Sequence, residues 1–552
     1  MEPFRPTLAI YGIQDTASGS FPKLIHDHNL ALFEQGRVLK YLHLERITRN
    51  KYDSSLPGHL YELLKSEGLA KPDEYDIVFA DHFIGRSFIS RQGNLRFEAN
   101  RQDQLCMSLE RGRAYWLGQQ REGWVLNHEL SHAYSVLPFV GQWHNNSLLF
   151  QFDGGASQGN YSIWHYNDNQ LRLIKNGWEL TYLSSLYNAN ALTFSLVGAN
   201  IQDQNSVPGK FMGYASMGVY RPEILQWLKE HAFFANAWKQ PKVILTAARK
   251  RFHRVPSVFD LHHPFIQDVA ATLQRYFEDE TLKFIEQAQS LCCAEHLYFS
   301  GGSALNIKLN RRIVASRLFQ SVHVPPATND SGLALGAGAA LELAKGHSIQ
   351  LHTPYLNNWG IGGYGNTPEY SRETLHEVAR RLVNGEVLGI CNGYGEVGPR
   401  ALGNRSIVAR PDSRKLAAKV SETHKQREWY RPIAPVMLSK YLSYFTAEAP
   451  VLELGRYMLT DYAVKPQRQS EIAGVVHSDG TARIQVLENR MSNPFLFDLL
   501  TYLDQEFQIK ALINTSFNGK GEPIVHTYKQ AEESARQMAL DGVVLGGNFK
   551  SL

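Results

Sequence analysis

Residues 147–155 read SLLFQFDGG, and residues 160–178 read NYSIWHYNDNQLRLIKNGW. The first stretch is apolar until it reaches Asp153 and two glycines, which predicts a strand with a carboxylate at its end. The second stretch carries short apolar runs on both sides of residues 167–169, which predicts a hairpin that turns there. Together the two stretches predict a strand followed by a hairpin.

An earlier part of the chain has the same layout. LAIYGI (8–13) predicts a strand, and NLALFEQGRVLKYLHLER (29–46) predicts a hairpin that turns at residues 34–36. Each copy places an acid beside the strand or the hairpin, Asp27 in the first copy and Asp153 in the second. The repetition indicates an internal duplication, which is typical of actin-like and sugar-kinase-like ATPases that bind nucleotide between two lobes.

Two glycine-containing loops are expected to face the cleft between such lobes. HLYFSGGSALN (296–306) predicts a buried strand, a turn at Gly301 and Gly302, and then a helix, which brings backbone N–H groups close to a ligand. VHVPPATNDSGLALGAGAALELA (322–344) predicts a strand, a loop and an Ala/Gly-rich helix capped near Asp330.

Four residues have the chemistry of one metal site: His128, His132, Asp153 and Asp330. The two histidines of NHELSHAYS (127–135) are four residues apart, so on a helix they share a face and can bind one ion. Two imidazoles with two carboxylates favour a borderline divalent ion, Fe(II), Mn(II) or Zn(II), over Ca²⁺ or Mg²⁺. Taken alone, the pair can also be two ordinary histidines on a helix.

The same histidine pair fits the H-E-x-x-H pattern of zinc peptidases, in which Glu129 would be the general base. The longer pattern with a third histidine does not follow. Duplicated β-lobes and glycine loops are also unexpected for a peptidase of this kind. The sequence therefore favours a metal site in a nucleotide-binding fold.

Composition places the chain among multidomain globular proteins. With 552 residues, 43% hydrophobic and 20% charged, it is long enough for several cores. Its net charge of +4 is far from that of a dedicated nucleic-acid binder. Cysteines 106, 292, 293 and 391 lack C-x-x-C spacing, which favours a reducing cytoplasm, and we expect the adjacent pair to be buried in a helix. We expect no signal peptide and no membrane span, because no stretch approaches ~20 apolar residues.

Residues 351–370, LHTPYLNNWGIGGYGNTPEY, are rich in Gly, Asn and Pro and predict a linker. A helix (371–385) and a strand (386–393) then begin a smaller α/β domain. We therefore expect an N-terminal domain at 1–350, a linker at 351–369 and a C-terminal domain at 370–552.

Arginines lie in Gly/Pro-rich loops of the second domain, and polar residues follow in INTSFNGKGEPIV (513–525). Guanidinium groups bind phosphate through paired hydrogen bonds, and Ser and Asn side chains orient anions or amides. Any one of these arginines alone could serve the surface or the structure. As a group they predict a phosphate site made of Arg400, Arg405, Arg431, Arg483, Asn514, Ser516 and Asn518.

Several long motifs occur in a characteristic order: LERITRNKYD, NHELSHAYS, FDGG, PGKFMGYASMG, SGGSALN, NDSGLALGAG, GPRALGNRSIVARP, RPIAP, HSDGTARIQ and NTSFNGKGEPIV. In these motifs the chain resembles, nearly end to end, the O-carbamoyltransferases that decorate antibiotics and nodulation factors. The resemblance implies an α/β protein with a TsaD-like, actin-like N-terminal domain (the ASKHA fold, with duplicated RNase H-like lobes) and a smaller YrdC-like α/β C-terminal domain.

The resemblance also implies two steps and an assignment of residues. The C-terminal domain would form carbamoyl-adenylate from carbamoyl phosphate and ATP, with Mg²⁺ accompanying ATP, and the N-terminal domain would transfer the carbamoyl group to an acceptor hydroxyl. The four metal-ligand residues would hold the ion, with Fe(II) first. The remaining N-terminal assignments are Gly301, Gly302, Asn306 and Lys210 at the adenylate, and His26 and Asp27 near the acceptor.

His26 would orient the acceptor hydroxyl or act as a general base, although a structural polar role at the start of a strand is equally compatible. The chain departs from the family pattern where QDTASGSFPKLI (14–25) separates the first strand from His26. An insertion there could reshape the acceptor pocket, so the acceptor stays open between a natural product, a sugar and a nucleoside-type molecule.

Two rival functions remain. A small-molecule kinase or ATPase of the actin-like fold would explain the first domain and leave the arginine-rich one without a role. A nucleic-acid modifier related to tRNA threonylcarbamoylation would require polynucleotide binding, which the modest charge disfavours. For partners we expect carbamoyl phosphate, ATP, a hydroxyl-bearing small molecule and a second copy in a homodimer.

Overall fold

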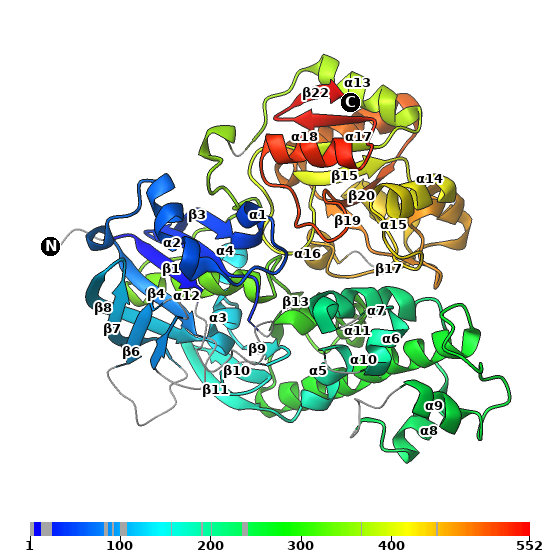
Figure 1. Cartoon of the computed structure of the whole chain (residues 1–552), viewed down its shortest axis with the longest axis horizontal. Coiled ribbons are helices and arrows are strands. Elements are labelled where there is room, and N and C mark those ends of the chain that lie inside the picture. Colours follow the sequence, from blue (N-terminus) through cyan, green and yellow to red (C-terminus); the bar gives the residue numbers. More distant parts are fainter. Residues whose placement is uncertain are drawn as a thin grey trace.

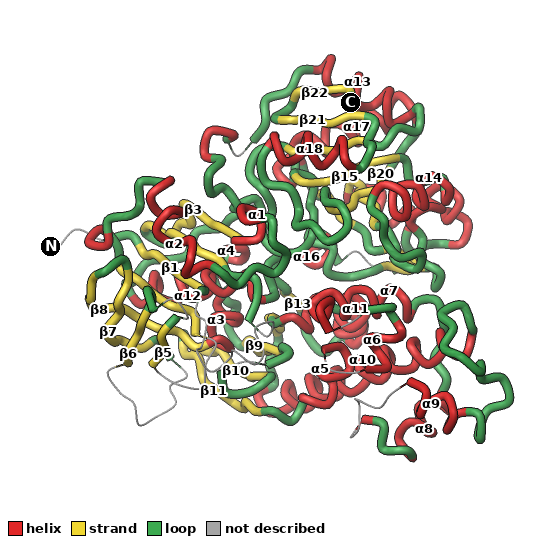
Figure 2. Tube along the Cα trace, in the orientation of Figure 1, coloured by secondary structure: helices red, strands yellow, loops and turns green. Residues whose placement is uncertain are grey.

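The computed structural model describes most of the chain. The described residues are 5–12, 25–81, 87–90, 93–99, 108–155, 157–188, 191–199, 201–234, 241–365, 367–448 and 451–552. The loop that separates the first strand from His26 lies outside these residues except for Ile25, and so does Cys106. Figure 2 shows strands on the left, a helical region at lower right and a further sheet at upper right.

The first sheet carries the N-terminal strand and hairpin. Its strand order is β3 (Arg37–His43), β2 (Asn29–Glu34), β1 (Thr7–Tyr11), β4 (Asp76–Asp81), β8 (Gln119–Asn127), β7 (Glu110–Trp116), β6 (Arg96–Ala99) and β5 (Ser87–Ile89). β1 is antiparallel to β2 and parallel to β4, and β4 is parallel to β8. The hairpin turns at residues 35–36, within the predicted turn.

The second sheet repeats this layout. Its order is β11 (Gln170–Gly177), β10 (Tyr161–Asn167), β9 (Ser147–Phe152), β12 (His296–Ser300) and β13 (Ser321–His323). β9 is antiparallel to β10 and parallel to β12, and β12 is parallel to β13. Order and directions therefore match β3-β2-β1-β4-β8, in agreement with the predicted duplication.

Two helices pack between these sheets: α3 (His128–Tyr134) and α12 (Leu333–Ala344) (Figure 1). α12 packs against β1, β2, β4 and α3. A Cβ on Gly336 of α12 would overlap the carbonyl oxygen of Ser131 in α3, so only glycine allows this approach. The close contact fixes the start of α12 beside the histidines of α3.

Further helices surround this part of the chain. They are α1 (Leu44–Thr48), α2 (Leu56–Ser66), η2 (Pro72–Glu74), α4 (Leu137–Val140), α5 (Thr181–Asn188), α6 (Ala191–Leu196), η3 (Ile201–Ser206), α7 (Val207–Ala215), α8 (Pro222–Glu230), α9 (Pro241–Ala248), α10 (Pro264–Cys292), η5 (Gly302–Leu305), α11 (Ile307–Ser316) and η6 (Asp330–Gly332). The expectation of a buried cysteine pair is wrong. α10 ends at Cys292, which is half-buried, and Cys293 is exposed because it caps the helix in the left-handed region with φ 51°.

The C-terminal part contains a mixed sheet in the order β19 (Gln485–Leu487), β16 (Ala434–Leu438), β20 (Ala511–Ser516), β15 (Arg405–Ala409), β14 (Leu388–Cys391), β21 (Gly542–Leu545) and β22 (Asn548–Ser551). α13 (Arg372–Val383) and α17 (Pro494–Phe507) cover one face, and α14 (Arg414–Ala418) and α18 (Tyr528–Gln537) the other. β17 (Tyr462–Ala463) and β18 (Thr481–Ala482) form a small separate ladder. Shorter helices are η7 (Gly362–Tyr364), the π-helix η8 (Lys419–His424), η9 (Ser439–Tyr441), α15 (Leu442–Phe445), α16 (Leu452–Gly455), η10 (Pro466–Val475) and η11 (Arg490–Ser492).

The predicted linker is packed against both parts. Asn357 bridges Tyr41 on one side and Gly395 on the other. Trp359 is buried, and its indole N–H donates to the carbonyl oxygen of Leu63 at 3.1 Å. The segment therefore holds the two α/β parts together through specific contacts.

Within the described residues, no helix combines the length and the apolar character needed to cross a bilayer.

Gly336→Ala should destabilise the protein by about 2 to 3 kcal/mol, because overpacking at the α3–α12 contact outweighs the better helix propensity of alanine. The thermal midpoint should fall by roughly 2 to 4 °C. Gly209→Ala in α7 is the matched control, since a Cβ there meets open space. An unchanged midpoint for Gly336→Ala would contradict the close approach of the two helices.

Candidate metal centre and cationic cluster

The two histidines come from the first turns of α3. Asn127 caps this helix, its side chain accepting a hydrogen bond from the Leu130 amide at 2.9 Å. His128 and His132 lie one turn apart, both fully buried, with their Nε2 atoms 3.0 Å from each other. The helix therefore directs both imidazoles to one point, as their spacing predicts.

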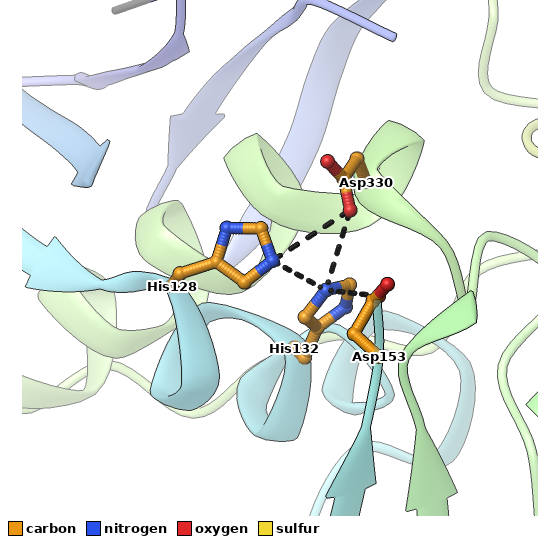
Figure 3. Close-up of side chains that lie close together, drawn as sticks. All are labelled: His128, His132, Asp153 and Asp330. Carbon is orange, nitrogen blue, oxygen red and sulfur yellow. Dashed lines mark hydrogen bonds and ion pairs between the residues drawn. The ribbon is translucent and has the colours of Figure 1, made fainter. Parts of the chain in front are cut away.

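The two carboxylates come from the second sheet and from the start of α12. Asp153 follows β9, and its Oδ2 lies 3.2 Å from Nε2 of His132. Asp330 opens η6, and its Oδ1 lies 3.6 Å from Nε2 of His128 and 3.5 Å from Nε2 of His132 (Figure 3). One ligand atom from each of the four residues lies within 4.8 Å of the others. Segments up to about 200 residues apart thus meet as predicted.

The charges of this cluster suit a divalent cation. Burial alone would raise the pKa of Asp330, but His26, His128 and His132 outweigh it and hold that pKa well below its usual range. Burial alone would lower the pKa of His132, yet Asp153 and Asp330 raise it to about 9. The buried carboxylate of Asp330 and the partly exposed one of Asp153 thus favour a positive charge between them, and two imidazole nitrogens beside them fit a borderline metal ion.

Neighbouring groups fix the orientation of both carboxylates. The Gly302 amide donates to Oδ2 of Asp153 at 2.7 Å, and the Tyr11 hydroxyl donates to Oδ2 of Asp330 at 3.0 Å. Gly301 has φ +91°, and a Cβ there would overlap the backbone of Phe152. The predicted glycine loop therefore lies directly against the metal-ligand cluster, and such outer contacts commonly orient metal ligands.

The other two residues predicted to bind the nucleotide are Asn306 and Lys210. Asn306 caps α11, accepting hydrogen bonds from the Leu309 amide and from Gln274, both at 3.1 Å. Lys210 of α7 forms an ion pair with Glu428 at 2.9 Å, so it lies beside the C-terminal part. The structure therefore brings Gly301 and Gly302 to the metal-ligand cluster, gives Asn306 a capping role and places Lys210 elsewhere.

His26 and Asp27 lie next to the cluster. Nδ1 of His26 is 3.0 Å from Oδ2 of Asp27 and 3.9 Å from Oδ2 of Asp330. Asn329 donates to the same Asp27 oxygen at 2.8 Å, while the other oxygen lies 3.0 Å from Nε2 of His43. Burial would lower the pKa of His26, but Asp330, Asp27 and Asp153 raise it to about 10. Asp27 thus holds the ring of His26 through one nitrogen.

A second group of potential ligands, Asp27, His43 and Glu45, lies beside His26. Sequence reasoning did not single out His43, because a lone histidine at the end of a strand carries no motif. Glu45 lies 3.5 Å from Nε of Arg46 and accepts from the Tyr52 amide at 3.0 Å. Glu45 already pairs with Arg46. We therefore interpret His43 and Glu45 as residues that hold Asp27 in place.

Glu129, the base required by the peptidase interpretation, is fully buried. Its Oε1 accepts a hydrogen bond from the Gln158 amide at 2.6 Å, and burial raises its pKa. It is absent from the group of potential metal ligands among the described residues. Glu129 therefore supports the loop that follows Asp153.

Three of the four predicted arginines of the C-terminal part, Arg400, Arg431 and Arg483, lie close enough to shift one another's pKa and form a cationic cluster. Burial lowers the pKa of Arg400 to about 10, and Arg431 contributes. Burial also lowers the pKa of Arg483 well below its usual range, with Arg400, Arg427 and Arg431 adding to the effect while Asp461 opposes it. Neighbouring guanidinium groups therefore destabilise one another's charge, and a bound anion would offset this repulsion.

The polar residues of β20 and the loop after it complete this cluster. Oγ of Ser516 accepts from Arg427 at 3.0 Å, and Oδ1 of Asn518 accepts from Lys425 at 3.0 Å. Asn514 instead donates to the carbonyl oxygen of Ala401 at 3.2 Å, which supports the loop that carries Arg400. Ser516 and Asn518 thus contact the cations directly, and Asn514 holds the loop that carries Arg400.

Arg405 has a different role from the one predicted. It is fully buried in β15, and its guanidinium group donates at 2.7 to 3.1 Å to the backbone carbonyl oxygens of Asn392, Gly393, Asn404 and His526. Its five N–H groups are all used, so none remains for a phosphate. Arg405 therefore braces the sheet beneath the cationic cluster.

Sequence reasoning missed three members of the cationic cluster. Lys425 and Arg427 lie in HKQREWYRP, and the density of cations just before RPIAP was an available signal. Lys51 comes from the N-terminal part. Lys51 is exposed at the edge of the cluster, and partial desolvation together with Arg431 and Arg427 lowers its pKa, while Glu45 raises it. Because Lys51 joins the cluster only through tertiary packing, its position in the sequence gave no sign of it.

Comparisons with known proteins agree on one family. The model described as "Carbamoyltransferase N-terminus" matches residues 117–341, and "Carbamoyltransferase C-terminus" matches residues 379–550. Nodulation protein NolNO of Sinorhizobium fredii is 25% identical over 552 residues, covering 95% of this chain and 78% of that protein. Nodulation protein U of Azorhizobium caulinodans is 33% identical over 269 residues, covering 46% of this chain and 45% of that protein.

Among solved structures, full-length HypF in its phosphate- and nucleotide-bound form matches 63% of this chain and 56% of its own length. The identity is 10% and the TM-score 0.33, a level that does not establish a shared fold.

Substitution of a single cluster residue should abolish metal binding. After reconstitution with Fe(II), Mn(II) or Zn(II) and desalting, the wild-type chain should retain about one ion. His132→Ala and Asp330→Asn should each retain less than about a tenth of that, measured by elemental analysis. His59→Ala, at an exposed histidine of α2, is the control. Full retention by His132→Ala would contradict the assignment.

Proposed function

Since this chain belongs to the carbamoyltransferase family, we propose that it is an ATP-dependent O-carbamoyltransferase that activates carbamoyl phosphate in one part and transfers the carbamoyl group in the other. The observation that carries the proposal is the cationic cluster of Arg400, Lys425, Arg427, Arg431 and Arg483. A kinase of the actin-like fold would have no use for this second site. The modest net charge of +4 also gives a polynucleotide substrate little support.

We assign activation to residues 370–552, a YrdC-like domain in this proposal. Water cleaves carbamoyl phosphate to carbamate and phosphate. A carbamate oxygen then bonds to the α-phosphorus of ATP, and pyrophosphate leaves with the electron pair of the broken bond. The guanidinium groups of Arg400, Arg431 and Arg483 offset the negative charge of the phosphates and of the leaving group. The product is carbamoyl-adenylate.

We assign transfer to residues 1–350, a TsaD-like domain of the actin-like fold in this proposal. The acceptor oxygen bonds to the carbamoyl carbon, AMP leaves, and the hydroxyl proton passes to His26. Asp27 occupies Nδ1 of that ring, so Nε2 is the nitrogen that accepts the proton. In this proposal Gly301 and Gly302 line the adenylate site, and the Gly302 amide holds Asp153. Asn306 caps the helix that follows, and Lys210, paired with Glu428, lies beside the C-terminal part.

A divalent ion, Fe(II) in the first instance, would be held by His128, His132, Asp153 and Asp330 and would supply Lewis acidity beside the carbamoyl group. Asp330 and Asp153 are two of the three carboxylates that raise the pKa of His26. Neutralising them would return His26 toward an uncharged form, which a general base requires. The proposed acceptor is a small molecule with a free hydroxyl, a nucleoside-type molecule included, and the proposed location is the cytoplasm.

The decisive experiment incubates the purified chain with ATP, carbamoyl phosphate, Mg²⁺ and a reconstituting metal, without acceptor. Mass spectrometry and a pyrophosphate assay should detect carbamoyl-adenylate, or AMP from its hydrolysis, in step with pyrophosphate. ADP with phosphate would instead support a kinase or ATPase and overturn the proposal.

The His132→Ala variant tests the division between the two parts. It should still form carbamoyl-adenylate, since the cationic cluster lies in the other part, and should lose transfer to an added acceptor. Equal loss of both reactions in a folded variant would contradict separate sites.

Arg431→Ala should raise the KM for carbamoyl phosphate by about tenfold or more, because one charge-assisted phosphate contact contributes roughly 1.5 to 3 kcal/mol. The rate of pyrophosphate release is the measurement. Arg490→Ala is the matched control, since Arg490 is exposed and pairs with Asp498 away from the cluster. Identical kinetics for Arg431→Ala and the wild-type chain would remove Arg431 from the site.

A further inference from the structure

Helix α11 joins the N-terminal part to the cationic cluster. It begins directly after the glycine loop, and in Figure 1 it lies on the side that faces β17. Nζ of Lys308 is 2.6 Å from Oδ2 of Asp461, forms an ion pair with Asp479 and donates to Oγ1 of Thr481 at 3.0 Å. One turn of this helix thus reaches three polar side chains of the C-terminal part.

Asp461 also faces an arginine of the cationic cluster. In the β17–β18 ladder Tyr462 pairs with Ala482, so Asp461 and Arg483 flank the same end of the ladder from opposite strands. Asp461 is buried, and its charge opposes the lowering of the pKa of Arg483. This single carboxylate therefore lies near two cations, Lys308 and Arg483.

Of these two cations, Lys308 is the one in close contact with Asp461. Among the described residues, no ion pair within 4.0 Å joins Arg483 to a carboxylate, and the buried Nε of Arg483 has no hydrogen-bond partner. A buried carboxylate requires a nearby positive charge, because leaving it unpaired is very unfavourable. Since Lys308 supplies that charge, Arg483 stays available for an anion.

We propose that Lys308 is a positioning residue that neutralises Asp461 and thereby keeps Arg483 free to bind phosphate. The proposal rests on the proposed function, because it takes the cationic cluster to be the phosphate site. Without Lys308, Asp461 draws Arg483 into an ion pair and the cluster loses one phosphate ligand. A side chain of the transfer part therefore controls anion affinity in the activation part.

Calorimetric titration of the full chain with inorganic pyrophosphate tests whether Lys308, by pairing with Asp461, leaves Arg483 free to bind an anion. Lys308→Met should weaken binding at least about tenfold, equivalent to about 1.4 kcal/mol. Lys308→Met combined with Asp461→Asn should recover affinity to within about threefold of the wild-type chain, because the carboxylate that faces Arg483 is then removed, while Asp479 stays hydrogen-bonded to Thr481 at 2.7 Å. Lys308→Arg should retain binding. Lys283→Met, at an exposed lysine of α10, is the matched control.

The outcomes separate this inference from the proposed function. A wild-type chain that neither binds pyrophosphate nor forms carbamoyl-adenylate contradicts the proposed function. If the wild-type chain binds pyrophosphate and Lys308→Met binds it equally well, the inference is wrong.

A double variant as weak as Lys308→Met also overturns the inference, since it would make Lys308 a simple structural support. Where Lys308→Met fails to fold, Asp461→Asn alone decides. It should bind pyrophosphate as tightly as the wild-type chain or more tightly, and a loss of binding overturns the inference.

Discussion

The contact between α3 and α12 is the constraint on which the rest of the site depends. α12 carries Asp330 at its entry and α3 carries both histidines, so the two helices must touch almost backbone to backbone. Gly336 makes this possible over Ser131, where any side chain would collide. The sheets on either side then supply Asp153 and the hairpin beside Asp27. A packing requirement in the core thus sets the geometry of a polar site.

The two sites have opposite electrostatic demands. The metal-ligand cluster concentrates carboxylates, which favour a cation, while the cationic cluster concentrates guanidinium groups, which favour an anion. Each cluster destabilises the fold when no ion of opposite charge is bound, because a buried charge loses its hydration. Keeping them apart avoids mutual neutralisation into a permanent salt bridge. Separation in space is therefore a physical condition for having both chemistries in one chain.

The sequence predicted what periodicity and local chemistry encode. Both hairpins, the strand before Asp153 and the convergence of His128 with His132 follow from spacing alone. Arg405 was misassigned because an arginine in a glycine-rich loop looks the same whether it meets phosphate or backbone carbonyls. Lys51 was missed because its partners lie in the other part of the chain. Periodicity reports local structure, and it carries no information about which distant loop a flexible cation will reach.

One short segment, residues 43–49, makes contacts toward both sites. Arg46, after β3, donates to the carbonyl oxygen of Gly398 at 3.0 Å, and Arg49 donates to those of Pro523 and Ile524 at 2.9 and 2.8 Å. His43, at the end of β3, holds Asp27 beside His26. The same short stretch therefore anchors the proposed base at one end and the C-terminal loops at the other. The stretch that positions His26 is thus hydrogen-bonded to loops of the C-terminal part, so the two sites share one structural support.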